Sequence, residues 1–498
     1  MKKIFIITTI TGFLSLAACN DFLDIPIEGS MPSTGLDYTK AENIFAPVSA
    51  AYASMRTYNT HSFPYISLEI ISDNADKGSD VTDGAEMLQF DKFTLVATNG
   101  LVNYLWAGYF DIVSAANYAI EEMPKFVEAQ QSQTNKDYAL QCQGEAKFIR
   151  AYAYFNLVRM FGSLPKIDRS MTSEELASQQ QITAAAMYEF IQQDLQDAID
   201  VLPESYSAAY AGRITKYTAM ALKAKTHLYR SEWNDAATLA DGVIASGRYD
   251  LQDFRKLFSI AGENGAESLF EIQCSTLGLS TGDAAIIPDG YAYVQGPRGN
   301  SPTNMQGWGF CVPSNDLIAF YTGRGETVRP ATTLLYRDTT TPEGDYISAN
   351  CTNPVYNGKV YTPSAYNNWS YNGYGFDHNV RILRYADVLL IYAEALEKGG
   401  VSSASPASGM TALQAVDKVR TRAGLGSVGA VTIRAIWDER RAELAMEEDR
   451  WMDLVRTGQA ATVLGPLGFT AGKNELYPIP AAQRQLNPNL DQNPGYTD

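Results

Sequence analysis

Three acidic side chains with a regular spacing, Glu439, Glu443 and Glu447, are the first candidates for catalytic chemistry. A glycosidase needs two carboxyl groups on opposite sides of a cleft. A spacing of four residues instead places these glutamates in a row on one face of a helix. Arg440 and Arg441 lie beside them. The pattern therefore predicts an ion-paired or solvated helix face, and it does not predict an active site.

The histidines and cysteines form no pattern that is typical of catalysis or metal binding. His61, His227 and His378 are far apart in the sequence, and His227 is expected to pack in a helical core. No CxxC pair is present among the cysteines beyond Cys19, which argues against zinc. Four cysteines allow three disulfide pairings, and the sequence selects none; they are Cys142, Cys274, Cys311 and Cys351. We expect no metal and no cofactor.

Aromatic side chains between residues 273 and 377 are the strongest binding signal. This segment is rich in Gly, Asn, Thr and Pro and has no long helical pattern, so we read it as a loop-rich insert with short strands. The apolar face of a sugar ring can lie flat on an aromatic ring, and nearby polar groups can bind its hydroxyls. The alternative role for these rings is to anchor the insert. The candidate ligand-binding residues here are Trp308, Trp369, Tyr371, Tyr291, Tyr293 and Arg298.

A second polar segment, residues 72–80, is dense in turn-forming residues and lies in a long irregular stretch from His61 to Thr98. Asn74 and Asp76 are its candidate ligand-binding residues, because amide and carboxylate groups accept hydrogen bonds from hydroxyls. The spacing does not match the calcium loop of an EF-hand. The alternative is a solvated polar turn.

The N-terminus predicts export and lipid anchoring. Residues 1–18 combine Lys2 and Lys3 with an apolar run that is short for a membrane span, which is typical of a signal peptide. Leu16-Ala17-Ala18-Cys19 resembles a bacterial lipobox, which implies lipidation of Cys19. Residues 19–36 are then a tether. The net charge of −17 argues against nucleic acid as a partner.

The remainder is predicted to be mostly helical and organised around a hairpin at residues 214–251, where Gly247 ends the second helix in the left-handed conformation. Its length is close to the period of a tetratricopeptide repeat, and one hairpin cannot bury its own apolar face. We divide the chain into a helical region at 37–272, the insert at 273–377 and a C-terminal region at 378–498. Further helices are expected at Asp37–Thr57, Leu101–Met123, Ala139–Phe161, Thr183–Leu202, Arg381–Lys398, Thr411–Arg422 and Thr432–Thr457. The last residues, around Ile479, are expected to pack as an extended strap.

Several motifs together resemble the SusD/RagB family of Bacteroidetes outer-membrane lipoproteins. They run from the lipobox cysteine to the C-terminus and include residues 19–26 (CNDFLDIP), 381–395 (RILRYADVLLIYAEA), 419–425 (VRTRAGL), 439–456 around Arg450-Trp451, 477–480 (YPIP) and 492–496 (QNPGY).

The resemblance implies an all-α dominated fold with a scaffold of tetratricopeptide-like hairpins. It also implies a lipid-anchored, cell-surface protein of the outer membrane that captures oligosaccharides and delivers them to a SusC-like TonB-dependent β-barrel. No catalysis is implied. The alternatives are a RagB-like peptide receptor and, more distantly, a secreted glycoside hydrolase.

Overall fold

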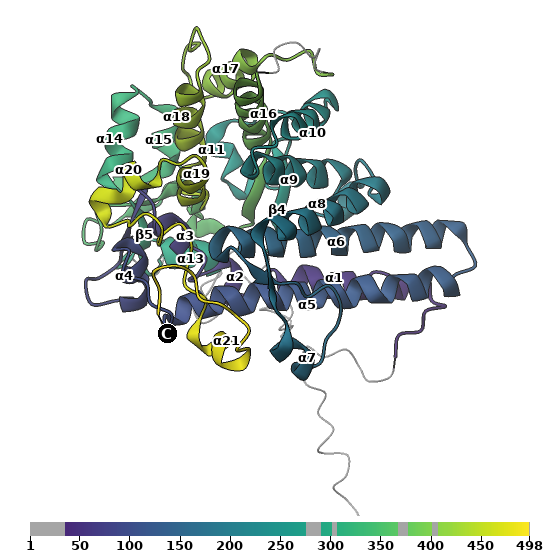
Figure 1. Ribbon diagram of the computed structural model, residues 1–498. Helices are drawn as coiled ribbons and strands as arrows, with labels where there is room; N and C mark the ends of the chain where they lie inside the picture. The colour runs from purple at the N-terminus through teal and green to yellow at the C-terminus, as the bar shows by residue number, and fades with distance from the viewer. Residues whose placement is uncertain (1–34, 275–289, 301–305, 367–376, 401–406, 498) are drawn as a thin grey trace, which may run out of the picture.

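The computed structural model describes residues 35–274, 290–300, 306–366, 377–400 and 407–497. Helices dominate this part of the chain, and the strands are short (Figure 1). The structure confirms the predicted all-α dominated class with short strands in the insert. The N-terminal tether, with Cys19, lies outside the described residues.

Two long antiparallel helices, α5 (Gly100–Ala129) and α6 (Gln133–Phe161), form one side of the molecule (Figure 1). Asn99 caps α5 by accepting hydrogen bonds from the backbone N–H groups of Leu101 and Val102. The helix continues past Pro124, where the sequence predicts its end. Proline cannot donate to the carbonyl of Ile120, and the side-chain amide of Gln143 in α6 donates to this oxygen at 3.1 Å instead.

The hairpin predicted at 214–251 is present as α9 (Lys216–Tyr229) and α10 (Trp233–Ala245). Gly247 follows with φ +63°, as predicted. The hairpin finds its apolar partners on both sides in the sequence: α9 packs against α8 (Ala184–Val201), and α10 packs against α16 (Tyr385–Gly399). Helix α16 packs in turn against α17 (Ala412–Arg422) and α18 (Ile433–Leu444). Stacked hairpins therefore bury one continuous core.

Two predicted helices in the C-terminal region are wrong in their bounds. The helix predicted at Arg381–Lys398 begins only at Tyr385, because residues Val380–Arg384 form strand β10 and pair with β4 (Ser268–Ile272). The helix predicted at Thr432–Thr457 is two helices, α18 and α19 (Arg450–Arg456). Between them Met446 and Glu448 have positive φ values, so the helix cannot continue.

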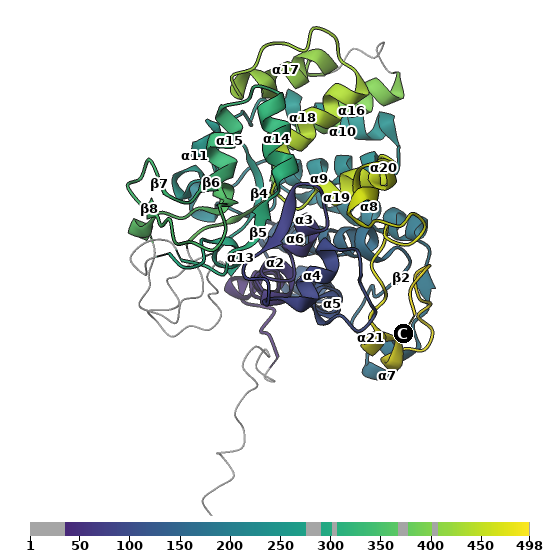
Figure 2. The ribbon, with the colours of Figure 1, turned by 90° about the vertical axis from the view of Figure 1, so that its left-hand side faces the viewer.

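Strands β4 and β10 flank the loop-rich insert, so the insert leaves and rejoins the scaffold at one small antiparallel sheet. Within the described residues the insert contains short elements only (Figure 2). They are α13 (Gly290–Gln295), β5 (Phe310–Pro313), α14 (Asn315–Gly323), α15 (Val328–Thr333), β6 (Leu334–Tyr336), β7 (Thr339–Thr340), β8 (Tyr346–Ile347), β9 (Val355–Asn357), η4 (Gly358–Val360) and η5 (Ser364–Tyr366).

The stretch from His61 to Thr98, predicted to be irregular, consists of short elements that pack on the scaffold.

The short elements of the N-terminal half are η1 (Ala41–Asn43), α1 (Ala46–Ser54), α2 (Tyr58–His61), α3 (Ser67–Ile70), β1 (Ala75–Gly78), α4 (Ala85–Asp91), β2 (Leu164–Pro165), α7 (Ser173–Ser178), β3 (Gln181–Ile182), η2 (Ala208–Tyr210), α11 (Phe254–Leu257) and η3 (Ile260–Gly262).

The C-terminal segment covers the core as a strap, as predicted. Tyr477 and Ile479 are fully buried, and the ring of Tyr477 stacks on Trp451 with 4.7 Å between centroids. The segment contains α20 (Ala460–Leu464), η6 (Gly465–Leu467) and α21 (Ala481–Leu486). Among the described helices, none combines the length and the apolarity that a membrane crossing requires.

Candidate functional site

The candidate site lies where the insert meets the segment around residue 78. Strand β1 pairs with β5 of the insert in antiparallel register, with Asp76 opposite Val312 and Gly78 opposite Phe310. These strands are more than two hundred residues apart in the sequence. The pairing brings the two segments that sequence analysis singled out, residues 72–80 and the aromatic part of the insert, to one place.

Three aromatic side chains, Phe63, Tyr293 and Trp308, form a half-buried aromatic cluster at this junction. The Trp308 ring lies edge-to-face against Phe63 at 5.7 Å and against Tyr293 at 5.9 Å between centroids. The backbone N–H of Trp308 donates to the carbonyl of Tyr293 at 3.1 Å. Gly307 permits this approach, because a Cβ at this position would overlap the same carbonyl and Gly296. The chain therefore places an indole and a phenol with partly exposed rings side by side.

An ion pair and a fixed loop supply the polar side of the site. Arg298 pairs with Asp83 and donates to the hydroxyl of Ser79 at 2.8 Å, and both charged side chains remain partly exposed. The loop at 78–83 folds around the ammonium group of Lys77, which donates to the carbonyls of Gly78, Asp80 and Asp83 at 2.8–2.9 Å. Burial lowers the pKa of Lys77, against the raising effect of nearby carboxylates. The aromatic cluster thus has donors and acceptors beside it, an arrangement suited to a polyhydroxylated ligand.

Comparison with known proteins identifies the relatives of this chain. A family model described as the SusD family matches residues 332–467, and one described as starch-binding associating with outer membrane matches residues 21–228. A SusD-like protein of Formosa agariphila is 31% identical over the full length of both chains. This chain belongs to the SusD family.

Solved structures confirm the tetratricopeptide-like helical fold of this SusD family member. A laminarin-binding SusD-like protein is 28% identical, with a TM-score of 0.78 over 91% of this chain and 99% of that one. Surface glycan-binding protein A from Bacteroides fluxus is 26% identical, with a TM-score of 0.78 over 92% of this chain and 100% of that one. The resemblance inferred from the sequence motifs is therefore confirmed.

The predicted ligand-binding residues of this SusD family member fall into three groups. Tyr293, Trp308, Arg298 and Asp76 lie at the junction described above, and Asp76 is exposed. Tyr291 and Asn74 are buried and act as framework: the Tyr291 hydroxyl donates to both oxygens of Glu448 at 2.7 and 2.8 Å, and Asn74 donates to Glu69 at 3.0 Å. Trp369 and Tyr371 lie outside the described residues.

Two members of the site, Phe63 and Asp83, are not among the residues predicted from the sequence. Both come from the stretch between His61 and Thr98, where no periodic pattern indicates which side chains face the insert. The signal in the sequence was a pair of glycines, Gly78 and Gly84, on either side of the loop that carries Asp83. Both glycines have positive φ values in the structure. Only the pairing of β1 with β5 shows that this loop faces Arg298.

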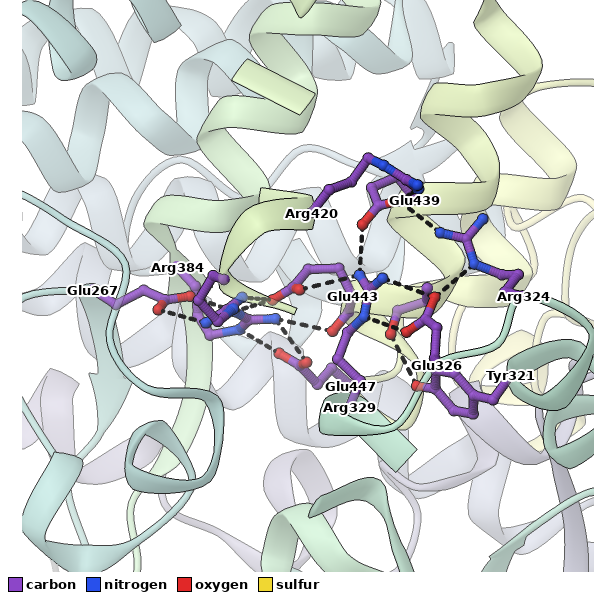
Figure 3. Close-up of polar contacts among 12 residues, drawn as sticks. Glu267, Tyr321, Arg324, Glu326, Arg329, Arg384, Arg420, Glu439, Glu443 and Glu447 are labelled. Atoms are coloured by element: carbon purple, nitrogen blue, oxygen red, sulfur yellow. Dashed lines mark hydrogen bonds and ion pairs between the residues drawn. The ribbon is translucent and has the colours of Figure 1, made fainter. Parts of the chain in front are cut away.

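Glu439 and Glu443 are buried on α18, whereas Glu447 lies beyond the end of this helix, so the prediction of one helix face is wrong for Glu447. All three glutamates are ion-paired, so the ion-paired form of the prediction is right and the solvated form is wrong (Figure 3). Glu443 contacts Arg384 at 3.0 Å and Arg422 at 2.5 Å. Burial alone would raise the pKa of Glu443, but the guanidinium groups of Arg422, Arg384 and Arg329 outweigh it and hold this pKa below its usual value. The three carboxylates join the insert to the scaffold: Glu439 binds Arg329 of α15, and Glu447 binds Lys359 of η4.

The histidines and cysteines belong to the framework. His61 contacts the carbonyl of Met55 and the hydroxyl of Tyr152, and burial lowers its pKa to about 4. His227 contacts Glu232 at 2.6 Å, in keeping with its predicted packed position. The four cysteines among the described residues are free thiols. In the same part of the chain, no group of three His, Cys, Asp or Glu side chains is placed to hold a metal ion.

Two short motifs with enzymatic associations have the wrong structural context. Residues 424–429 read G-L-G-S-V-G, but they follow helix α17 and precede α18, whereas a dinucleotide-binding motif needs a strand before it. Residues 278–282 read G-L-S-T-G and lie outside the described residues. That pattern marks a nucleophile only at a strand-to-helix turn of an α/β-hydrolase sheet, and the sheets of the described residues are two-stranded and antiparallel.

Proposed function

We propose that this SusD family member is a lipid-anchored, cell-surface binding protein that captures oligosaccharides and delivers them to a SusC-like TonB-dependent transporter. The observation that carries the proposal is the aromatic cluster Phe63–Tyr293–Trp308 beside the Arg298–Asp83 pair. Aromatic faces next to fixed polar groups suit a ligand whose rings are apolar on their faces and hydroxylated at their edges.

Neutral glucans are the first ligands to test, since relatives of this chain are named for binding laminarin and glycans. The chain is acidic overall, which disfavours polyanionic glycans. The proposed role is binding without catalysis, because the carboxylates at 439, 443 and 447 are each neutralised by basic partners and do not face each other across a cleft.

Titration calorimetry of the purified protein against laminarihexaose, maltohexaose and cellohexaose tests the binding step. We expect saturable binding of at least one oligosaccharide, recovered intact by chromatography after incubation. Binding of peptides with no binding of any glycan would favour the RagB-like alternative, and cleavage of the glycan would favour a hydrolase.

Co-purification in mild detergent tests delivery. A SusC-like barrel expressed with this protein should elute with it. Recovery of this chain alone, with the barrel present in the extract, would contradict the delivery step while leaving the binding step intact.

A further inference from the structure

A groove, remote in sequence from the aromatic cluster, lies on the helical scaffold. It has a volume of about 400 Å³ and is lined by Glu204, Tyr206, Tyr210, Arg248, Tyr249 and Asn264, among others. Its walls are the loop that precedes α9, the residues that follow α10, and strand β4 with the residues that precede it. None of its lining residues belongs to the aromatic cluster or to its polar partners.

One wall of this groove is held in place by a buried ion pair. Glu145 of α6 is fully buried and binds Arg213 of the loop, and it also accepts a hydrogen bond from the Tyr206 hydroxyl at 3.1 Å. The guanidinium of Arg213 lies 4.4 Å from the ring centre of Phe45 and 4.6 Å from that of Tyr206. The same guanidinium lies 5.3 Å from the ring centre of Tyr138 and 5.8 Å from that of Tyr210. A cation that contacts several aromatic rings and pairs with a buried carboxylate fixes the orientation of Tyr206 without a ligand.

The opposite wall is also fixed. The side-chain amides of Asn264 and Gln273 exchange two hydrogen bonds, at 2.8 and 3.0 Å. Gly212 of the loop that precedes α9 has φ +88°, and a Cβ at this position would overlap the side chain of Gln273. The loop conformation that opens the groove is therefore specified by the sequence and does not depend on a bound partner.

The exposed groups in the groove have the chemistry of a carbohydrate site. Tyr210 is 57% exposed, and Tyr206 and Tyr249 each leave part of a ring accessible. Arg248 and Glu204 form an exposed ion pair at 2.6 Å, so they offer donors and acceptors with no net charge. Such a lining suits a neutral, hydroxylated ligand better than an anion or a cation. A pocket of this volume accommodates a short oligosaccharide segment.

We propose that this groove is a second carbohydrate-binding site, which takes a short segment of the same neutral glycan as the aromatic cluster. The inference rests on the proposed glycan-binding function. Two sites on one rigid scaffold bind a long chain more tightly than either site alone, because the second binding event is intramolecular.

Calorimetry with laminarihexaose, maltohexaose and cellohexaose tests the second site through stoichiometry. The wild-type protein should bind two molecules of the preferred hexasaccharide. Tyr210→Ala should remove one of them, Trp308→Ala should remove the other, and the double variant should bind none. Tyr336→Ala serves as the matched control, because Tyr336 is 42% exposed and lines neither site; it should bind like the wild type.

A single binding event that Trp308→Ala abolishes and Tyr210→Ala leaves unchanged would overturn the second site while supporting the proposed function. Absence of binding of all three hexasaccharides would overturn both. Melting curves of each variant check that the scaffold is intact, and Arg248→Ala provides a second variant in the groove, with an expected loss of about tenfold in the affinity of that site.

Discussion

A guanidinium nitrogen of Arg329 lies 2.7 Å from a carboxylate oxygen of Glu439, and both side chains are completely buried. Arg329 belongs to α15 of the insert and Glu439 to α18 of the scaffold. Glu326 contacts the same guanidinium at 2.6 Å, and Glu439 is also bound by Arg324 and Arg420 (Figure 3). The described part of the insert is thus attached to the scaffold through charges that cannot separate without leaving ions in a low-dielectric interior.

Removal of Glu439 should therefore destabilise the protein strongly. Glu439→Ala leaves the guanidinium of Arg329 short of one buried partner, and loss of one member of a buried pair costs about 3–5 kcal/mol. The matched control on the same helix is Arg434→Ala, which removes an exposed pair with Asp438 and should change the stability by less than about 1 kcal/mol. Urea unfolding measures both. Equal midpoints for the two variants would contradict the structural role of Glu439.

The stability should fall as the pH rises above about 4.3, the ordinary glutamate pKa, because two carboxyl groups are buried without a basic partner among the ion pairs of the described residues. Burial raises the pKa of Glu69 to about 7 and that of Glu448 well above its usual range. An acid with a raised pKa in the folded state binds a proton that the unfolded chain releases. The stability gained from this bound proton is therefore complete below about pH 4.3, the ordinary glutamate pKa. It is lost as the pH rises through the pKa of the folded state.

Glu448→Gln tests this dependence, since glutamine keeps the acceptor for the Tyr291 hydroxyl and cannot ionise. We expect a smaller loss of the free energy of unfolding between pH 6 and pH 9 than in the wild type, and a higher melting temperature at pH 8. The exposed Glu128→Gln is the control and should follow the wild-type profile. Superimposable profiles for Glu448→Gln and the wild type would rule out this carboxyl as the source.

The aromatic cluster should depend on Gly307. A methyl group at Gly307 would overlap the carbonyl of Tyr293 and the backbone of Gly296, so Gly307→Ala must displace Trp308 from Tyr293. We expect the affinity for the preferred glucan to fall at least tenfold, together with a lower melting temperature. Gly323→Ala is the control, because a Cβ at this helix end meets no atom within 4 Å, and it should leave both unchanged or raise stability slightly. Calorimetry and melting curves that do not separate the two variants would show that the cluster tolerates the displacement.

Cys19 should be the membrane anchor. Cys19→Ala is expected to release the protein from the outer membrane without a change in its melting temperature, because Ile44 is the first fully buried apolar residue in the part of the chain that the structure describes. Membrane fractionation with a carbonate wash measures the release. Full retention of the variant in the washed membrane would show that lipidation does not hold the protein there.

The sequence predicts the long helices well and their ends poorly, for reasons that lie outside each segment. Arg381–Arg384 are strand residues because β4, more than a hundred residues earlier, supplies hydrogen-bond partners. The break between α18 and α19 depends on Glu69, whose carboxylate accepts hydrogen bonds from the backbone of Met446 and Glu448 at 2.8 Å. Helical periodicity carries no information about either partner.

The same limit applies to the candidate site. Composition is enough to indicate Trp308, Tyr293 and Arg298, because aromatic and charged residues are conspicuous in a Gly- and Asn-rich segment. Composition does not distinguish Tyr293 from Tyr291, although the two side chains lie on opposite sides of one short helix. Tyr293 is partly exposed, whereas Tyr291 is buried against Glu448. Partners from the scaffold, Phe63 and Asp83, are visible only once β1 and β5 are paired.

Ligand binding at the aromatic cluster is tested most directly by the affinity of Trp308→Ala for the glucan hexasaccharide that the wild type prefers, measured by titration calorimetry. Trp437→Ala is the matched control, because Trp437 is a half-buried tryptophan on α18 that packs under Lys398. We expect the affinity to fall about tenfold to a hundredfold in Trp308→Ala, with an intact melting transition, and to be unchanged in Trp437→Ala. Wild-type affinity in Trp308→Ala would contradict glycan binding at the aromatic cluster.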